Sequence, residues 1–376
     1  MYVVKQYDYR NIFNIMKFMA DARATPANSL DEARKVILLS RKLELHREKN
    51  HSDFWQNFLK FKYKVAYTLE NIFQNPRLFL VFILGRFNLV RFLYALAWRW
   101  RSQPKRASDR KSLFPHIEPD RIVDNLKKDG IYTDFSLPPK ILVGLLHRAK
   151  SQDCYAGGNS DVGFNISQKH EVDLIYNKPF YVARYFNISS GWTEILQLAS
   201  DPKIQEIADR YIGQPAKYTG ASLFWTFPIR GTSQDSDQQK FSYFHYDLDD
   251  FASLRFCFYL TDVDEENGPH LCIRGSHLKK SIWDVLNFFT RIQSPEKLSK
   301  FYGTEKFVTL QGDSGTGFIE DTFCFHKGIP PKSKPRLFLQ LHFAANNYSD
   351  TEYLDDRDPN SLKHFQPTST ILGARS

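Results

Sequence analysis

The sequence predicts a mainly β fold with flanking helices, in which the β part forms a sandwich or jelly roll. From Tyr218 onward, short apolar runs alternate with turn residues, and many short strands at such spacing are typical of these architectures. The content of 32 Phe, 19 Tyr and 6 Trp favours a β-rich core with an aromatic-lined pocket. The predicted strands are Leu223–Phe227, Phe241–Asp247, Leu254–Leu260, Leu271–Ile273, Phe307–Leu310, Gly317–Ile319 and Leu337–Phe343.

The chain is expected to divide into a helical region, a linker, a main domain and a tail. In the first region, Ser29 is a candidate N-cap followed by acids and by apolar residues at helical spacing, and a second helix is expected over Asp53–Phe73. Polar residues broken by three prolines then indicate a linker. The predicted boundaries are 1–101 for the helical region, 102–120 for the linker, 121–348 for the main domain and 349–376 for the tail.

Helical patterns open the main domain. A helix from Ile122 is expected to stop at Gly130, and a short strand and a helix over Pro138–Ala149 follow. The polar, glycine-containing stretch Cys154–Lys178 is expected to form surface loops, and Trp192–Ile212 is periodic up to Gly213.

The basic charge of the chain is concentrated in residues 77–111. This stretch holds nine Lys/Arg against one acid, Asp109, whereas the whole chain carries +9. It contains the most apolar part of the chain, Leu78–Trp100, but Arg86, Asn88 and Arg91 interrupt the roughly 20 apolar residues that a bilayer span needs. Two readings stay open: a helix packed against the main domain, or a basic amphipathic helix that makes peripheral contact with an anionic membrane.

Bulk features also bear on compartment and partners. The four cysteines form no CxxC pair, and the N-terminal residues lack a basic leader followed by an apolar core, so we expect a reducing, cytoplasmic location without a secretory signal. Outside 77–111 the chain is close to neutral, so we expect no nucleic-acid partner.

Three residues form a candidate metal site. His245 and Asp247 are two apart, so on an extended strand both side chains would point to one face. His326 lies 79 residues beyond Asp247, far enough for jelly-roll strands to return beside the first. Two His and one carboxylate with the opposite positions free are the ligand set of non-haem Fe(II) oxygenases. Arg336, which opens the run to Phe343, could hold the carboxylate of a co-substrate in a bidentate pair.

Other polar and aromatic residues have plainer interpretations. His270 and His277 are expected to make hydrogen bonds in loops. His342 is expected to be a satisfied strand histidine, with a position facing the pocket as the alternative. Glu320 and Asp321 are expected to be solvated. Leu223, Trp225 and Phe227 alternate on one strand face, which favours core filling, with Trp225 lining the pocket as the alternative.

The stretches around these residues resemble the phytanoyl-CoA dioxygenase-like enzymes. The similar stretches cover about residues 120–348. They are Leu126–Ile131, Ile207–Gln214, Leu254–Pro269, Gly275-Ser276-His277, His326-Lys327-Gly328 and Pro335-Arg336.

The resemblance implies a double-stranded β-helix that binds Fe(II) through His245, Asp247 and His326. It also implies that 2-oxoglutarate chelates the metal, with its distal carboxylate on Arg336, and that O2 is consumed. Cys257 occupies a strand position that is often Trp in relatives and can touch the co-substrate.

The functional hypothesis is therefore an Fe(II)- and 2-oxoglutarate-dependent oxygenase that hydroxylates a small or lipid-like organic molecule. Two alternatives stay open. One is a non-catalytic or regulatory jelly-roll module that keeps the metal motif. The other is a membrane-surface oxygenase acting on a lipid or lipid-linked glycan. The sequence indicates neither the substrate nor the oligomeric state.

Overall fold

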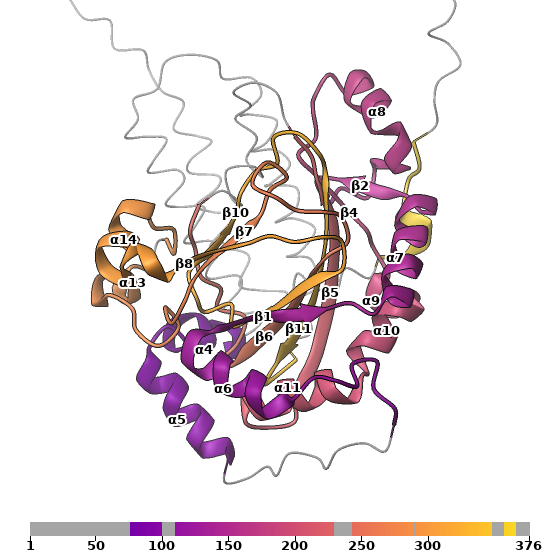
Figure 1. Cartoon of the computed structure of the whole chain (residues 1–376). Coiled ribbons are helices and arrows are strands. Elements are labelled where there is room, and N and C mark those ends of the chain that lie inside the picture. The colour runs from indigo at the N-terminus through magenta and orange to yellow at the C-terminus, as the bar shows by residue number, and fades with distance from the viewer. Residues whose placement is uncertain (1–75, 100–109, 229–242, 289, 348–356, 366–376) are drawn as a thin grey trace, which may run out of the picture. The chain divides into compact units, whose positions relative to one another are not determined.

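The computed structural model describes residues 76–99, 110–228, 243–288, 290–347 and 357–365 (Figure 1). The chain divides into two compact units, Met1–Glu70 and Asn71–Ser376, and every described residue belongs to the second. The helices expected near Ser29 and over Asp53–Phe73 lie outside the described residues, as does the larger part of the expected linker. The domain boundaries given above therefore stay a prediction.

Two antiparallel sheets form the core, which confirms the predicted mainly β, jelly-roll class. Within the described residues, one sheet has the strand order β1-β9-β6-β11-β5-β4-β2-β3, and the other has the order β10-β7-β8. The strands are β1 Ile131–Ser136, β2 Cys154–Ala156, β3 Gly163–Phe164, β4 Val182–Arg184, β5 Lys217–Thr226, β6 Ser253–Tyr259, β7 His270–Ile273, β8 Phe307–Leu310, β9 Thr316–Glu320, β10 His326–Gly328 and β11 Arg336–Ala344.

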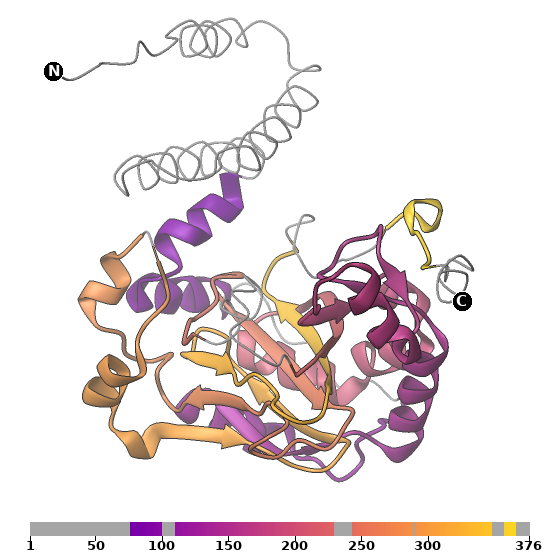
Figure 2. The ribbon, with the colours of Figure 1, turned by 90° about the horizontal axis from the view of Figure 1, so that it is seen from above.

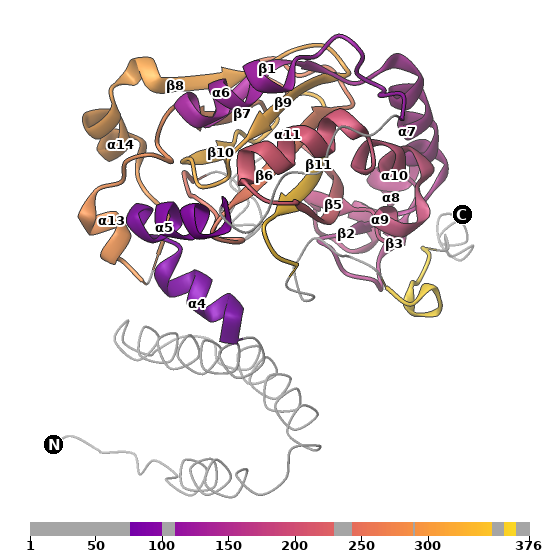
Figure 3. The ribbon, with the colours of Figure 1, turned by 90° about the horizontal axis from the view of Figure 1, so that it is seen from below.

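Helices surround the sheets. The helices are α4 Pro76–Leu84, α5 Asn88–Arg99, α6 Pro119–Asp129, α7 Pro139–Ser151, α8 Lys169–Ile175, α9 Ile188–Gly191, α10 Thr193–Ala199, α11 Pro202–Ile212, α13 Ile282–Leu286 and α14 Pro295–Tyr302, with 3₁₀ turns at Ile166–Gln168, Thr304–Lys306 and Pro359–Ser361. Figure 2 and Figure 3 show the helices of the α7 to α11 region gathered on one side of the large sheet.

The two faces of the large sheet carry different cores because side chains alternate along each strand. On β11, Leu337, Leu339 and Leu341 join the cluster that α6, α7, α10 and α11 complete. Phe338 faces the other way and packs with Cys272 and Leu310 of the small sheet. The space between the two sheets is therefore where a site can form.

Most predicted helix ends are confirmed. Helix α6 ends at Gly130, which adopts φ 72° as a C-cap and donates its N–H to Leu126 O. The periodic stretch Trp192–Ile212 is two helices rather than one. The break falls where Asp201 accepts the N–H groups of Lys203 and Ile204 and Pro202 opens α11.

Two sequence expectations are wrong. Cys154–Lys178 was expected to form surface loops, but β2 and β3 extend the large sheet beyond β4, and β2 is buried. Strands of three and two residues are too short to show an alternating pattern. Phe244 and His245, within the expected strand Phe241–Asp247, form only isolated bridges to Gln293 and His326.

The apolar stretch from Leu78 is interrupted near Gly85, where α4 ends and the chain turns into α5. Arg86 is fully buried there, and its Nη1 donates to Val285 O (3.1 Å) and Asn287 O (3.0 Å). Among the described residues, none of the helices combines the length and hydropathy needed to cross a bilayer. The two helices contact the rest of the described domain through Arg86 and through Arg91 of α5.

Candidate metal centre

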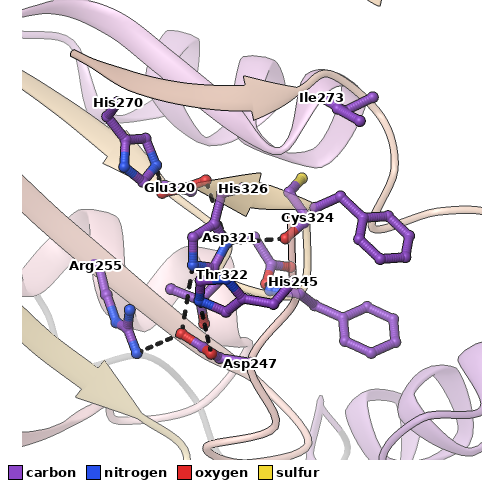
Figure 4. A network of polar contacts seen from close by, with 12 residues as sticks. His245, Asp247, Arg255, His270, Ile273, Glu320, Asp321, Thr322, Cys324 and His326 are labelled. Carbon is purple, nitrogen blue, oxygen red and sulfur yellow. Dashed lines mark hydrogen bonds and ion pairs between the residues drawn. The ribbon is translucent and has the colours of Figure 1, made fainter. Parts of the chain in front are cut away.

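Backbone pairing brings the three predicted ligands together (Figure 4). His245 N–H donates to His326 O (3.0 Å), and His326 N–H donates back to His245 O (2.8 Å). Asp247 N–H donates to Thr322 O (2.8 Å), so the two segments run side by side. His245 Nε2 lies 3.8 Å from Asp247 Oδ1, and His326 Nε2 lies 3.6 Å from Asp247 Oδ2. One donor atom from each residue falls within 4.8 Å of the others.

The rings of both histidines are oriented for metal binding. His245 Nδ1 lies 2.9 Å from Tyr243 O, and His326 Nδ1 lies 3.0 Å from Cys324 O. A carbonyl can only accept, so each Nδ1 carries a proton, and in the neutral imidazole the lone pair lies on Nε2, the atom nearest Asp247. This outer hydrogen bond is the usual way in which proteins fix a metal-binding imidazole.

Electrostatics keeps His326 and Asp247 in their ligand forms. Burial lowers the pKa of His326 to about 4, so the imidazole is neutral at neutral pH. Burial alone would raise the pKa of Asp247, but Arg255, whose Nη2 lies 2.8 Å from its Oδ2, together with His326 and His245, holds that pKa below its usual value. Asp247 is therefore a carboxylate with a charge partner on one side and two imidazoles on the other.

A second buried carboxylate lies behind His326. Glu320 Oε2 lies 2.9 Å from His270 Nε2, and its Oε1 lies 3.8 Å from His326 Nδ1. Burial would raise the pKa of Glu320, but His270 and His326 lower it to about 2. The expectation that Glu320 and Asp321 are solvated is therefore wrong, because both are buried. No local pattern indicated the partner of Glu320, because His270 lies 50 residues earlier in the chain.

Arg336 is buried at the start of β11, on the interior face with Phe338. Its Nη1 donates to Gly268 O, its guanidinium carbon lies 5.1 Å from the Phe338 ring, and burial lowers its pKa. In the part of the chain that the structure describes, its Nε has no hydrogen-bond partner. Stacked rings of Phe338, Phe318 and His270 connect it to His326, with centroids 5.9, 5.2 and 5.4 Å apart in turn. A buried donor without a partner is uncommon in folded proteins and needs a physical explanation.

The remaining predicted residues divide between the two cores. Trp225 lies in the helix-side core, where its Nε1 donates to Tyr185 OH (2.9 Å), so the structure does not bring it to the ligand cluster. Cys257 is fully buried on the interior face of β6, in the same cluster as Phe338. His342 is a buried strand histidine whose Nδ1 accepts from Arg255 Nε (3.0 Å).

Sequence reasoning missed Arg255. This residue stands among the apolar residues of β6, and a single arginine in a strand gives no signal of its partners. Only the pairing of β6 with β11 and the loop from Asp247 place it between Asp247, Asp249 and His342.

The fold and the cluster together define a double-stranded β-helix protein with a two-histidine, one-carboxylate site. The family model described as phytanoyl-CoA dioxygenase (PhyH) matches residues 176–336 of the chain, which confirms the resemblance over that stretch. A search of curated proteins found no match.

A search of solved structures found similar chains at low sequence identity. The epimerase SnoN in complex with Fe3+, alpha ketoglutarate and nogalamycin RO is 15% identical with a TM-score of 0.44, over 64% of this chain and 90% of that one. EctD from S. alaskensis with 2-oxoglutarate and 5-hydroxyectoine is 16% identical with a TM-score of 0.41, over 70% of this chain and 92% of that one. The carbocyclase SnoK is 15% identical with a TM-score of 0.42, over 67% of this chain and 97% of that one.

Proposed function

We propose that the chain is an Fe(II)- and 2-oxoglutarate-dependent oxygenase that hydroxylates a small or lipid-like organic molecule. The observation that carries the proposal is the convergence of His245, Asp247 and His326, with both Nε2 atoms and the carboxylate facing one point. Neutral imidazoles and one carboxylate suit ferrous iron and leave positions for other ligands. The family assignment of residues 176–336 supports the same class.

The protein residues have distinct roles in this proposal. His245, Asp247 and His326 would hold the metal, while Tyr243 O and Cys324 O keep the two imidazoles in the required tautomer. Iron, when bound with 2-oxoglutarate, would supply the activation of O2 that hydroxylation requires. Arg255 would keep Asp247 ionised and would form an ion pair with one oxygen of its carboxylate.

Arg336 would bind the distal carboxylate of 2-oxoglutarate. Its buried Nε without a partner and its fixed Nη1 leave a guanidinium edge for a carboxylate. The interior aromatic rings around it exclude water, which strengthens such a pair. Cys257, on the same interior face, is the proposed further neighbour of the co-substrate.

Two measurements on the full chain test the proposal. The first is the visible charge-transfer band of an Fe(II)–2-oxoglutarate chelate, formed anaerobically, and the second is succinate release from 2-oxoglutarate in air with Fe(II) and ascorbate. The wild type is expected to give both, and His245→Ala to give neither. His147→Ala, an exposed histidine on α7, serves as the matched control and should match the wild type.

Arg336→Met separates the two parts of the site. The variant should still bind the metal, but its affinity for 2-oxoglutarate should fall by about 10- to 100-fold, the effect of losing one charge-assisted hydrogen-bonded pair. The proposal is wrong if the wild type forms no chelate band, or if His245→Ala forms it as well as the wild type does.

A further inference from the structure

Helix α5 has its apolar side chains directed to solvent. Leu89, Phe92, Leu93 and Leu96 follow the i, i+3, i+4, i+7 spacing of one helical stripe, and they are between 42% and 68% exposed. An ordinary surface helix buries such a stripe against its core. In α5 the stripe faces the opposite way.

The polar side of α5 faces the protein and fixes this orientation. Arg91 Nη1 donates to Asp250 O (3.2 Å), and its Nη2 lies 3.8 Å from Asp321 Oδ1. Asn88 Nδ2 donates to His277 O (3.2 Å). Tyr94 OH accepts from Asn346 Nδ2 (2.8 Å). Turning the stripe inward would leave these groups without their partners, which is costly when they are half-buried.

The stripe is part of a larger apolar face. Helix α4 adds exposed leucines, and α13 is joined to α4 because Arg86 at the end of α4 donates to carbonyls at the end of α13. Figure 3 shows α13 beside α4 and α5. We call the docking face the following exposed residues: Leu80, Leu84, Leu89, Phe92, Leu93, Leu96, Ile282, Trp283 and Leu286.

Charge and residue type around the docking face indicate its partner. Helices α4 and α5 contain no acidic residue, and the only acid of α13, Asp284, is buried and paired with Lys297. Exposed cations stand in α4 and close to α13, at Arg77 and Lys279. Trp283 is 75% exposed, the largest exposure among the large hydrophobic side chains of the described residues, and tryptophan is enriched where protein meets the lipid–water boundary.

We propose that the docking face binds the surface of an anionic lipid bilayer. The apolar stripe of α5 and Trp283 enter the boundary between headgroups and acyl chains, and the cations around them contact anionic headgroups. This inference does not depend on the proposed activity, because it rests on α4, α5 and α13 alone.

Vesicle co-sedimentation of the full chain tests the proposal. The wild type, a Phe92→Ser/Leu93→Ser/Trp283→Ser variant and a Val143→Ser/Leu174→Ser control are compared on phosphatidylcholine vesicles with and without phosphatidylglycerol. The control residues are 65% and 67% exposed, on α7 and α8. All five positions are exposed, so far-UV circular dichroism and the thermal midpoint should match the wild type.

The wild type and the control are expected to bind anionic vesicles, and the triple variant at least about tenfold less tightly, because three apolar side chains no longer enter the bilayer. Binding to neutral vesicles should be weaker for all three. The proposal is overturned if the triple variant binds as the wild type does, or if neutral and anionic vesicles bind equally. It is also overturned if the wild type does not bind vesicles and instead self-associates through the docking face, in a concentration-dependent manner that the triple variant abolishes.

Discussion

Removing Arg255 should destabilise the metal-free protein strongly. Its guanidinium Nη2 lies 2.8 Å from Asp247 and 2.9 Å from Asp249, and its Nε donates to His342 Nδ1 (3.0 Å). The side chain of Arg255 is 8% exposed, and those of the two carboxylates are 15% and 20% exposed. Arg255→Leu would leave two largely buried carboxylates close together without this cation.

The expected magnitude follows from the burial of the pair. Breaking a buried ion pair by removing one partner costs about 3–5 kcal/mol, because the remaining charge is not compensated. We expect the free energy of unfolding of the metal-free chain at pH 7 to fall by about that amount. A divalent ion at the site would provide Asp247 with another cation. Saturating Mn(II) should therefore stabilise the variant more than it stabilises the wild type.

Urea unfolding of the full chain with a chelator and then with Mn(II) measures both quantities. The matched control is Arg210→Leu, since Arg210 pairs with Asp120 and Glu206 at the surface, where Asp120 is 82% exposed. The control should lose less than about 1 kcal/mol, as exposed pairs do. The role given to Arg255 is refuted if Arg255→Leu lowers the free energy of unfolding no more than Arg210→Leu does. It is also refuted if Mn(II) stabilises Arg255→Leu and the wild type equally.

Two further predictions concern the surroundings of His326. Burial lowers the pKa of His326 from 6.5 to about 4. As the pH falls, this histidine therefore takes up its proton in the unfolded chain before it does so in the folded chain. The free energy of unfolding of the metal-free chain should fall by up to roughly 3 kcal/mol between pH 6.5 and 4. Urea unfolding measured as a function of pH should show that His326→Gln lacks this loss. Burial also lowers the pKa of His342, but this histidine is present in both proteins and contributes equally to both pH profiles. Equal pH profiles for the two proteins would contradict the role given to His326. Gly130→Ala should lower the thermal midpoint and cost about 2 kcal/mol or more, because Gly130 has φ 72° and a Cβ there would overlap Cys324 Sγ. Gly191→Ala, whose Cβ would meet nothing within 4 Å, should change little, and equal losses in the two variants would contradict this account.

The sequence predicted those parts of the site that follow from local spacing. His245 and Asp247 are two residues apart, and His326 and Arg336 belong to apolar runs that match strands, so the ligand set could be proposed from patterns alone. The stop of α6 at Gly130 was predictable for the same reason, because a glycine after a periodic stretch is the usual helix end.

The residues behind the ligands could not be predicted, because their roles depend on strand pairing. Glu320 reaches His270 and His326 only after β9, β7 and β10 are assembled, and its solvated interpretation failed for that reason. Arg255 needs β6 beside β11 and the loop after Asp247. Trp225 packs in the helix-side core, the interpretation that the sequence favoured. Its two alternatives stayed open because a shift of one residue along a strand moves a side chain to the other face of the sheet.

The sequence periodicity of α5 alone predicts the opposite orientation of this helix, with its apolar stripe toward the core. Its apolar stripe predicts burial, but the helix is held by its polar side, since Arg91 connects the segment after Asp247 to the segment before His326 through Asp250 and Asp321. Those two segments are the ones whose backbone pairing assembles the metal ligands. The two faces of this short helix therefore differ: the inner face contacts the loops that carry the predicted ligands, and the outer face is apolar. Under the proposed docking, the apolar stripe of α5 would contact lipid while Arg91 and Asn88 on its other side keep their contacts with the protein.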